Sequence, residues 1–501
     1  MQDETTTHNK ELSLLEALIP LIVLIALLAY NVYVFGDDAL SGSNQFVLLL
    51  GAAVAAIVGF RNKVSYKRMI EEVASNLKST TGAILILLMV GALAGTWLIS
   101  GIIPAMIYYG LQILNPTIFL PATVIICAII SIATGSSWTT SATVGIALIG
   151  IGGAIGLPLG MVAGAVLSGA YFGDKMSPLS DTTNLAPAMA GAELFSHIRY
   201  MALTTVPTIV ITLIIFTIIG LTRDVSGATD TATLLTDIKA SFNINPFLFL
   251  VPVFVIGMIV RKTKPLVALL IGALLGGVFA VIFQPQIIKD VVASYMISLD
   301  DSLVRSEVLE SLQFNLETIY TGVMQALTVE VNIPSDNETL ADLFSAKGMA
   351  GMLGTIWLII CAMVFGGVMD AIGALAKISS ALLSLAQSVF GLFASTVASC
   401  LAINLTASDQ YLAIVVPGKM FSKAYEERGL APENLSRTLE DSGTVTSVLV
   451  PWNTCGAYQS GVLGVSVLEY FVYAIFNYLS PFMTLTYALF KIKIKMLREG
   501  E

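Results

Sequence analysis

Carboxylates, hydroxyls and an amide gather in a short segment, Gly173–Asn184, between long apolar runs. Their oxygens are hard ligands for a small cation, and carboxylates also bind protons. Ionisable groups beside apolar spans are costly, so Asp174 and Asp181 are candidate functional residues. Ser177 followed by Pro178 is typical of a helix N-cap and first helical residue, which predicts an unwound stretch before a new helix. The alternative is a solvated loop outside the membrane.

A second polar segment, Thr134–Thr143, is rich in hydroxyls and flanked by apolar residues. Unsatisfied polar groups in hydrocarbon cost several kcal/mol each, so these side chains must face protein or water. Close helix packing through small residues is one interpretation. The density of hydroxyls favours a re-entrant or broken segment that lines a site, with Ser137 and Thr140 among the candidate cation ligands.

The second half of the chain carries similar clusters. Asp409 follows an Asn/Thr/Ser-rich stretch, Asp441 and Thr444 lie in another, and Asn453 comes shortly afterwards. Pro451 interrupts this last segment and predicts a second broken helix.

The amino-acid composition indicates which class of protein carries these polar groups. Of 501 residues, 56% are hydrophobic and 12% charged, and the mean hydropathy is +0.85. Soluble domains carry about 25% charged residues, and a β-barrel would show short alternating strands. We therefore predict an all-α polytopic membrane protein with broken helices and re-entrant hairpins at 135–156 and 404–418. Spans are expected near 14–36, 45–60, 82–113, 117–134, 157–172, 201–222, 245–260, 265–284, 350–375, 378–403 and 463–490.

Orientation follows from the short loops rich in Lys and Arg, which stay in the cytoplasm. Such residues cluster at 61–78, at 261–264 and in the C-terminal tail, which is therefore expected inside. Segment 285–345 contains ten Asp and Glu against two Lys and Arg, so we expect it outside. The net charge of −9 argues against a nucleic-acid partner.

Several motifs recur at a similar spacing. Trp97 and Trp357 both come shortly after a Gly-Thr pair, and their separation along the chain is 357 − 97 positions. Asp174 and Asp441 have a similar separation of 441 − 174 positions. Such repeats, inverted by the predicted topology, are a signature of secondary transporters with a site at the midplane. The predicted units are N-terminal peripheral helices (1–79), a first transport repeat (80–222), connecting helices with the acidic loop (223–349), a second repeat (350–475), and a final helix end with a basic tail (476–501).

Gly169–Gly191, preceded by Thr134–Gly145, closely resembles the NhaC type of Na⁺/H⁺ antiporter within the ion transporter superfamily. The resemblance covers roughly residues 80–222 and 350–475, including the segment 440–458. It implies a bacterial cytoplasmic membrane location, an inverted-repeat scaffold, a homodimer and an elevator motion. The implied partners are Na⁺, H⁺ and the lipid bilayer, with no cofactor. The family also includes exchangers of organic anions such as malate and lactate.

The expected mechanism is competition. A carboxylate in a desolvated pocket has its pKa raised towards neutrality, so it can bind either a proton or a sodium ion near pH 7. Asp174 and Asp181 are the predicted competing groups, with Asp409 and Asp441 as further ion- or proton-binding residues. The predicted Na⁺ ligands, with those of the paired second-half site, are Ser137, Thr140, Ser177, Thr182, Asn184, Thr444 and Asn453.

Two rival functions compete with this one. A Na⁺- or H⁺-coupled carrier of organic anions or amino acids would need cations for the substrate carboxylate, and the polar clusters offer few of them, such as Lys175 and Lys419. An intramembrane enzyme is not expected, because His8 and His197 cannot form an HExxH site and no nucleophile motif is evident.

Overall fold

The computed structural model describes residues 12–35, 39, 42–113, 115–222, 231–300, 302–335 and 338–497, and His8 lies outside them. Within them the chain is almost entirely helical, apart from the short strands β1 (Val331–Asn332) and β2 (Ser345–Ala346), which pair antiparallel with Val331 opposite Ala346. The first part of the chain contains α1 (Leu14–Phe35), α2 (Ser43–Arg61), α3 (Tyr66–Ile99), α4 (Ile102–Ile113), α5 (Pro116–Thr134), α6 (Ser137–Thr140), the π-helical turn η2 (Ser141–Gly145), α7 (Ile146–Ala154), α8 (Leu159–Met176), α9 (Asp181–Ala190), α10 (Leu194–Thr222), α11 (Thr231–Ser241), η3 (Pro246–Phe249), α12 (Leu250–Val260) and α13 (Pro265–Phe283).

The elements that follow begin with the segment predicted to be an acidic external loop, which is largely helical. They are α14 (Pro285–Leu299), α15 (Arg305–Ser311), α16 (Leu316–Thr328), α17 (Glu338–Leu343), η4 (Ala350–Met352), α18 (Leu353–Ala371), α19 (Ala374–Ser384), α20 (Val389–Thr406), α21 (Gln410–Glu426), α22 (Pro432–Leu439), the π-helical turn η5 (Glu440–Thr444), η6 (Ser447–Leu449), α23 (Thr454–Leu463), α24 (Val467–Phe471) and α25 (Ile475–Leu489).

Among the described residues, eight helices are long and apolar enough to span a membrane, or nine if the bent pair around α12 counts as one span. The prediction of an all-α polytopic membrane protein is confirmed. Three predicted spans are wrong as single helices, because 82–113, 378–403 and 463–490 are each divided. The first divides at Gly101, whose positive φ of 79° no regular helix contains. The second divides where Ser388 caps α20 by accepting a hydrogen bond from the backbone N–H of Gly391.

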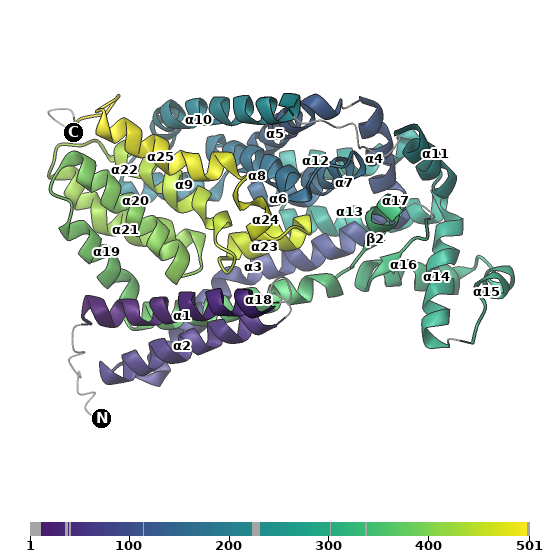
Figure 1. Ribbon diagram of the computed structural model, residues 1–501, viewed down its shortest axis with the longest axis horizontal. Helices are drawn as coiled ribbons and strands as arrows, with labels where there is room; N and C mark the ends of the chain where they lie inside the picture. The colour runs from purple at the N-terminus through teal and green to yellow at the C-terminus, as the bar shows by residue number, and fades with distance from the viewer. Residues whose placement is uncertain are drawn as a thin grey trace.

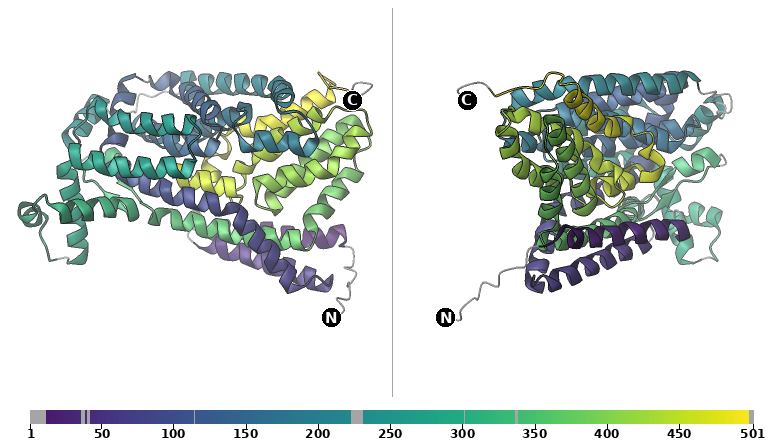
Figure 2. Two further views of the ribbon diagram at one scale, coloured as in Figure 1. Left: turned by 180° about the vertical axis from the view of Figure 1, so that it is seen from behind. Right: turned by 60° about the vertical axis from the view of Figure 1, so that its left-hand side comes forward.

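The long helices lie roughly along the long axis of the molecule (Figure 1). Helices α1 and α2 form one edge, and α10 lies along the opposite edge, as the views in Figure 2 also show. The start of α1 and the end of α25 lie at the same end of the molecule, while α14, α15 and α16 project from the other end. This arrangement separates the C-terminal tail from the acidic segment, and the cytoplasmic side stays a prediction.

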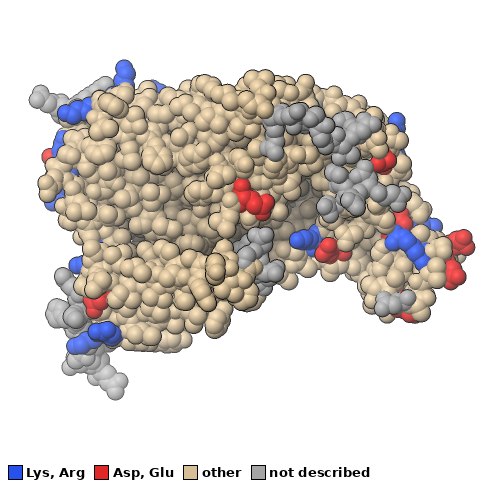
Figure 3. Space-filling view, viewed as in Figure 1, with Lys and Arg blue, Asp and Glu red and all other residues tan. Residues whose placement is uncertain are grey.

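Charged side chains follow the same division. On the face shown in Figure 3 they gather near the two ends, and the broad middle of the molecule is almost free of them. Exposed apolar side chains such as Val210, Ile214 and Ile218 of α10 suit contact with lipid rather than water.

Helices α5 and α8 pack closely because α8 presents glycines to α5. A Cβ added at Gly169 would lie 2.2 Å from the carbonyl oxygen of Val124, and one at Gly173 would lie 2.5 Å from that of Ala128. The Ser131 hydroxyl of α5 donates a 2.6 Å hydrogen bond to the backbone of α8. Small residues spaced by four allow such contact between apolar helices. This packing fixes the end of α8, where Asp174 lies.

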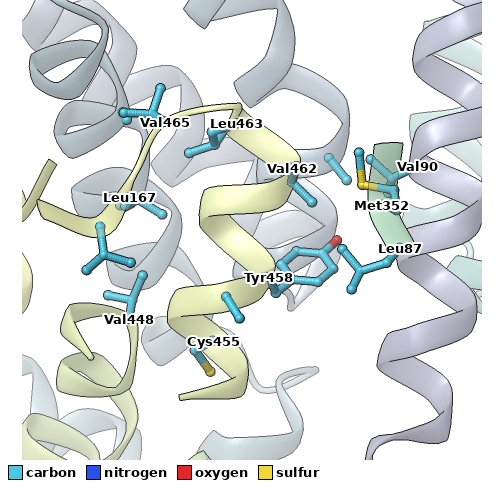
Figure 4. Packing of buried hydrophobic residues seen from close by; sticks show 14 of the residues in the cluster. Leu87, Val90, Leu167, Met352, Val448, Cys455, Tyr458, Val462, Leu463 and Val465 are labelled. Atoms are coloured by element: carbon cyan, nitrogen blue, oxygen red, sulfur yellow. The ribbon is translucent and has the colours of Figure 1, made fainter. Parts of the chain in front are cut away.

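Helix α23 joins the two parts of the chain through its apolar side chains. Tyr458 and Val462 point towards Leu87 and Val90 of α3 (Figure 4). The ring of Tyr458 also stacks on Trp138 with centroids 3.9 Å apart. The second-half helix is thereby packed against the first-half segment that carries the hydroxyl cluster.

Helix boundaries recur along the chain at an almost constant offset. The offset between the starts of α8 and α22 (432 − 159) equals the offset between the starts of α9 and α23 (454 − 181). The ends of α5 and α20 (406 − 134) differ from this offset by a single position. Helices α9 and α23 are also equal in length, and each ends at a glycine with positive φ, 81° at Gly191 and 67° at Gly464. A duplicated unit would produce this order of elements.

The predicted topology can be tested by labelling. We expect a cysteine replacing the exposed Glu310 to react with an impermeant maleimide on intact cells, because it would lie outside. A cysteine replacing Lys67 should react only after lysis. The native cysteines are buried and should contribute little background. The opposite labelling pattern would overturn the assignment of sides.

The glycine contact predicts a stability change. Gly169→Ala should lower the free energy of unfolding by about 1–3 kcal/mol, because its methyl group would collide with rigid backbone. Gly257→Ala is the matched control, since no atom lies within 4 Å of a Cβ placed there. Thermal unfolding of the purified variants measures both effects. Equal stability of the two variants would contradict the close approach of α5 and α8.

Candidate functional site

Four interruptions of helices supply the polar groups of the candidate site. Each is followed by a residue whose side-chain oxygen caps the next helix: Ser136 before α6, Ser180 before α9, Asp409 before α21 and Asn453 before α23. The chain reverses direction through positive φ at Gly135 (69°). The equivalent interruption before α21 places Ser408, a non-glycine residue, at a φ of 58°. The prediction of broken segments within 135–156 and 404–418 is confirmed.

These interruptions meet around one cavity of about 530 Å³. Its lining combines all four interruptions with part of α3 and the α12–α13 loop. The lining residues are Ser79, Thr80, Gly82, Ala83, Ile86, Thr134, Gly135, Ser136, Trp138, Thr139, Asp174, Leu179, Asp181, Ile259, Lys262, Thr263, Lys264, Pro265, Asp409, Gln410, Tyr411, Thr454 and Cys455.

Asp174 lies at the cavity near the end of α8 and is 5% exposed. One carboxylate oxygen, Oδ2, accepts hydrogen bonds from the Ser137 hydroxyl at 2.7 Å and from the Ser137 backbone N–H at 3.1 Å. The other, Oδ1, has no hydrogen-bond partner among the described residues. The carboxylate is therefore held in place by one oxygen, while its second oxygen is buried without a hydrogen-bond partner in the described part of the chain.

Two further carboxylates line the cavity. Asp181 is exposed to it and accepts a hydrogen bond from the Tyr411 hydroxyl, which comes from the other half of the chain. Asp409 is 5% exposed and accepts a 2.9 Å hydrogen bond from the backbone N–H of Leu412. Three acidic side chains from both halves of the chain thus share one cavity, which is the charge that a cation site requires.

The fourth predicted acid, Asp441, has a different environment. It does not line this cavity; it forms a fully buried ion pair with Lys175. The carboxylate also accepts hydrogen bonds from the hydroxyls of Thr204, Ser480 and Thr484. A buried ion pair is tolerable only when its remaining hydrogen-bonding capacity is satisfied in this way. The interpretation of the Asp174–Lys175 segment as a solvated loop is therefore wrong.

The sequence profile of the Na⁺/H⁺ antiporter family matches residues 169–492, which include this ion pair and all three acidic residues that line the cavity. The chain belongs to that family. Membership makes the protein a transporter rather than an enzyme and confirms the resemblance to the NhaC type.

Individual relatives agree with the family match. The chain is 36% identical to the Na⁺/H⁺ antiporter NhaC of Alkalihalophilus pseudofirmus over 88% of each protein. It is 34% identical to an uncharacterised Na⁺/H⁺ antiporter of Haemophilus influenzae, over 99% of this chain and 100% of the relative. It is also 35% identical to the malate-2H⁺/Na⁺-lactate antiporter of Bacillus subtilis, over 88% of this chain and 86% of the relative.

The prediction that Ser177 caps a helix is wrong in this antiporter. Ser180 is the cap, since its hydroxyl accepts the Thr183 backbone N–H at 3.3 Å. Residues 177–180 form a turn closed by a hydrogen bond from Ser180 N–H to the Ser177 carbonyl. Ser177 instead donates its hydroxyl to the carbonyl of Ile132 in α5. Pro178 therefore lies within the turn and does not begin a helix.

The remaining predicted ligands do not line the cavity, and their role in ion binding stays a prediction. Thr140 donates to the carbonyl of Ser136, and the hydroxyl of Thr182 is hydrogen-bonded to that of Ser180. Asn184 is exposed and donates to the carbonyl of Ser180. Thr444 and Asn453 are buried; the first hydroxyl has no partner among the described residues, and the second side chain caps α23.

Sequence reasoning missed Tyr411 and the lysines of the α12–α13 loop as site residues. Tyr411 adjoins Asp409 in an interruption that was recognised, so its proximity was a usable signal. Lys262 and Lys264 were interpreted only as markers of the cytoplasmic side. Their approach to the cavity depends on how α12 and α13 pack, which no local pattern reports.

The arrangement predicts that Asp174 is required for cation binding. Asp174→Asn should abolish Na⁺ binding to the purified antiporter, because the amide keeps the shape but removes the negative charge. Asp290→Asn, which removes an acid paired with Arg305 outside the cavity, should bind Na⁺ as the parent does. Titration calorimetry measures both variants, with thermal unfolding as the control for folding. Parental affinity in Asp174→Asn would exclude this carboxylate from the site.

Proposed function

We propose that this antiporter exchanges Na⁺ for H⁺ across the bacterial cytoplasmic membrane by alternating access, with both ions competing at the cavity carboxylates. The observation that supports this most directly is the meeting of Asp174, Asp181 and Asp409 in one cavity bordered by four helix interruptions. A cluster of acidic groups in a low-dielectric site favours bound protons or cations.

The competing group with the most suitable geometry is Asp174. Its Oδ1 has no partner among the described residues, while Ser137 fixes Oδ2. A proton on this carboxyl removes the charge that a sodium ion needs, so the two ligands exclude each other. Asp181 and Asp409 add negative charge, and hydroxyls and carbonyls at the interruptions provide neutral oxygen ligands.

The recurrence of helix boundaries supports two transport repeats, 80–222 and 350–475. The interruptions that border the cavity fall at matched positions, because the offset from Ser136 to Asp409 (409 − 136) equals that from Ser180 to Asn453 (453 − 180). In an inverted pair such interruptions meet at the midplane, where movement of one repeat exposes the site to alternate sides. The Lys/Arg distribution supports a cytoplasmic C-terminus.

A second candidate function is exchange that includes an organic anion. The cavity volume of about 530 Å³ is within the range of small-molecule sites, about 300–1,000 Å³. Lys262 and Lys264 line it and could neutralise a carboxylate. The Bacillus subtilis relative is named for malate and lactate exchange.

Reconstitution in liposomes distinguishes the two functions. With an internal pH dye and an imposed proton gradient, Na⁺ added with an inert anion should collapse the gradient, because the competition requires only a cation. Choline should not do so, and Asp174→Asn should be inactive with Na⁺. A response that appears only when malate, lactate or an amino acid is added would favour the organic-anion function instead.

A further inference from the structure

Glu440 is a buried acid that the cavity does not use. It is fully buried in the π-helical turn η5, beside Asp441. Neither carboxylate oxygen has a hydrogen-bond partner within the described part of the chain, and the same is true of the Thr444 hydroxyl one turn later. Isolated π-helical turns often occur at functional positions. Glu440 is therefore a buried acid that has neither a hydrogen bond nor an ion pair among the described residues.

Among the described residues, neither of two buried cations in this region, Lys175 and Arg437, forms an ion pair with Glu440. Lys175 forms its ion pair with Asp441 and also donates to the Ser480 hydroxyl at 3.1 Å. Arg437 is fully buried with its guanidinium 4.5 Å from the centre of the Tyr200 ring, and it makes no ion pair within 4.0 Å among the described residues. Neither cation is bonded to Glu440.

An ionised carboxylate in this position would lack both hydrogen bonds and a paired cation. Burying such an unpaired charge is unfavourable, whereas a neutral carboxyl is far less costly to bury. A proton is also the one cationic ligand that needs no coordination shell. We propose that Glu440 is a second proton-binding site, outside the cavity, and that it gives up its proton when Na⁺ enters the cavity.

Electrostatic coupling through α8 connects the two sites. Asp174 faces the cavity, and the adjacent Lys175 faces the acidic pair Glu440 and Asp441. An ionised cavity carboxylate favours protonated Glu440, because like charges repel. Sodium cancels that charge, and Lys175 then favours the ionised form. This inference rests on the proposed Na⁺/H⁺ exchange and adds a second proton to it.

The groups that influence whether Glu440 is protonated or ionised lie on several elements around η5. Charged or titratable residues on those elements include Asp174 and Lys175 on α8, Asp181 on α9, His197 on α10, Cys400 on α20, Tyr425 on α21, Arg437 on α22, Asp441 in η5 and Tyr487 on α25.

The test compares Glu440→Gln with the parent protein by two readouts. In Na⁺-free buffer at neutral pH, the infrared C=O band of a protonated carboxylic acid should be present in the parent and diminished in the variant. In weakly buffered solution, the variant should release about one proton fewer per Na⁺ bound. Glu469→Gln is the control, because Glu469 belongs to the surface capping box of α24 and Gln preserves that motif.

An unchanged carboxylic-acid band in Glu440→Gln, or an unchanged proton count, would overturn the inference. Glu440→Asp keeps a titratable group and should retain both signals, which provides a second variant if the glutamine form does not fold. A parent protein that releases no protons on Na⁺ addition would contradict the proposed exchange itself. In that case the infrared comparison still decides whether Glu440 holds a proton.

Discussion

A helix interrupted inside a bilayer frees backbone N–H and C=O groups that lipid cannot satisfy, and the site depends on how this chain meets that constraint. After each interruption, a side-chain oxygen accepts a hydrogen bond from one of the freed backbone N–H groups. The accepting side chains are those of Ser136, Ser180, Asp409 and Asn453. Irregular backbone at this depth is tolerated only against protein or a water-filled cavity. Residues at or directly beside all four interruptions line the same cavity.

Burial of charge depends in turn on close helix packing. Gly169 and Gly173 allow α8 to approach the backbone of α5, and this positions Asp174 against Ser137. The next residue, Lys175, forms an ion pair with Asp441. The oxygens of Asp441 also accept hydrogen bonds from hydroxyls of α10 and α25. Two adjacent residues of one helix thus serve different purposes, one facing a ligand cavity and the other joining the two halves of the chain.

The sequence predicted the helical membrane class, most spans and the interrupted segments, because hydropathy, proline and clustered hydroxyls are local signals. It also selected Asp174, Asp181 and Asp409, which the structure brings together. It did not predict that Ser180 rather than Ser177 caps α9, because the choice depends on how the turn at Pro178 closes against α5. The pairing of Asp441 with Lys175 across 266 residues, and the isolation of Glu440, depend on tertiary packing that no sequence pattern reports.

The ion pair between Lys175 and Asp441 is not equivalent in the two proposed repeats. At the offset that relates α8 to α22 and α9 to α23, Lys175 corresponds to Val448, and Asp441 corresponds to Ser168 rather than to Asp174, the counterpart predicted from the sequence motifs. Neither counterpart carries a charge, so exchanging the roles of the repeats would not reproduce this contact. A pair of identical inverted units would give inward- and outward-facing states of equal free energy. If the protein alternates between two such states, as proposed above, this asymmetry gives them different free energies even before any ion gradient acts.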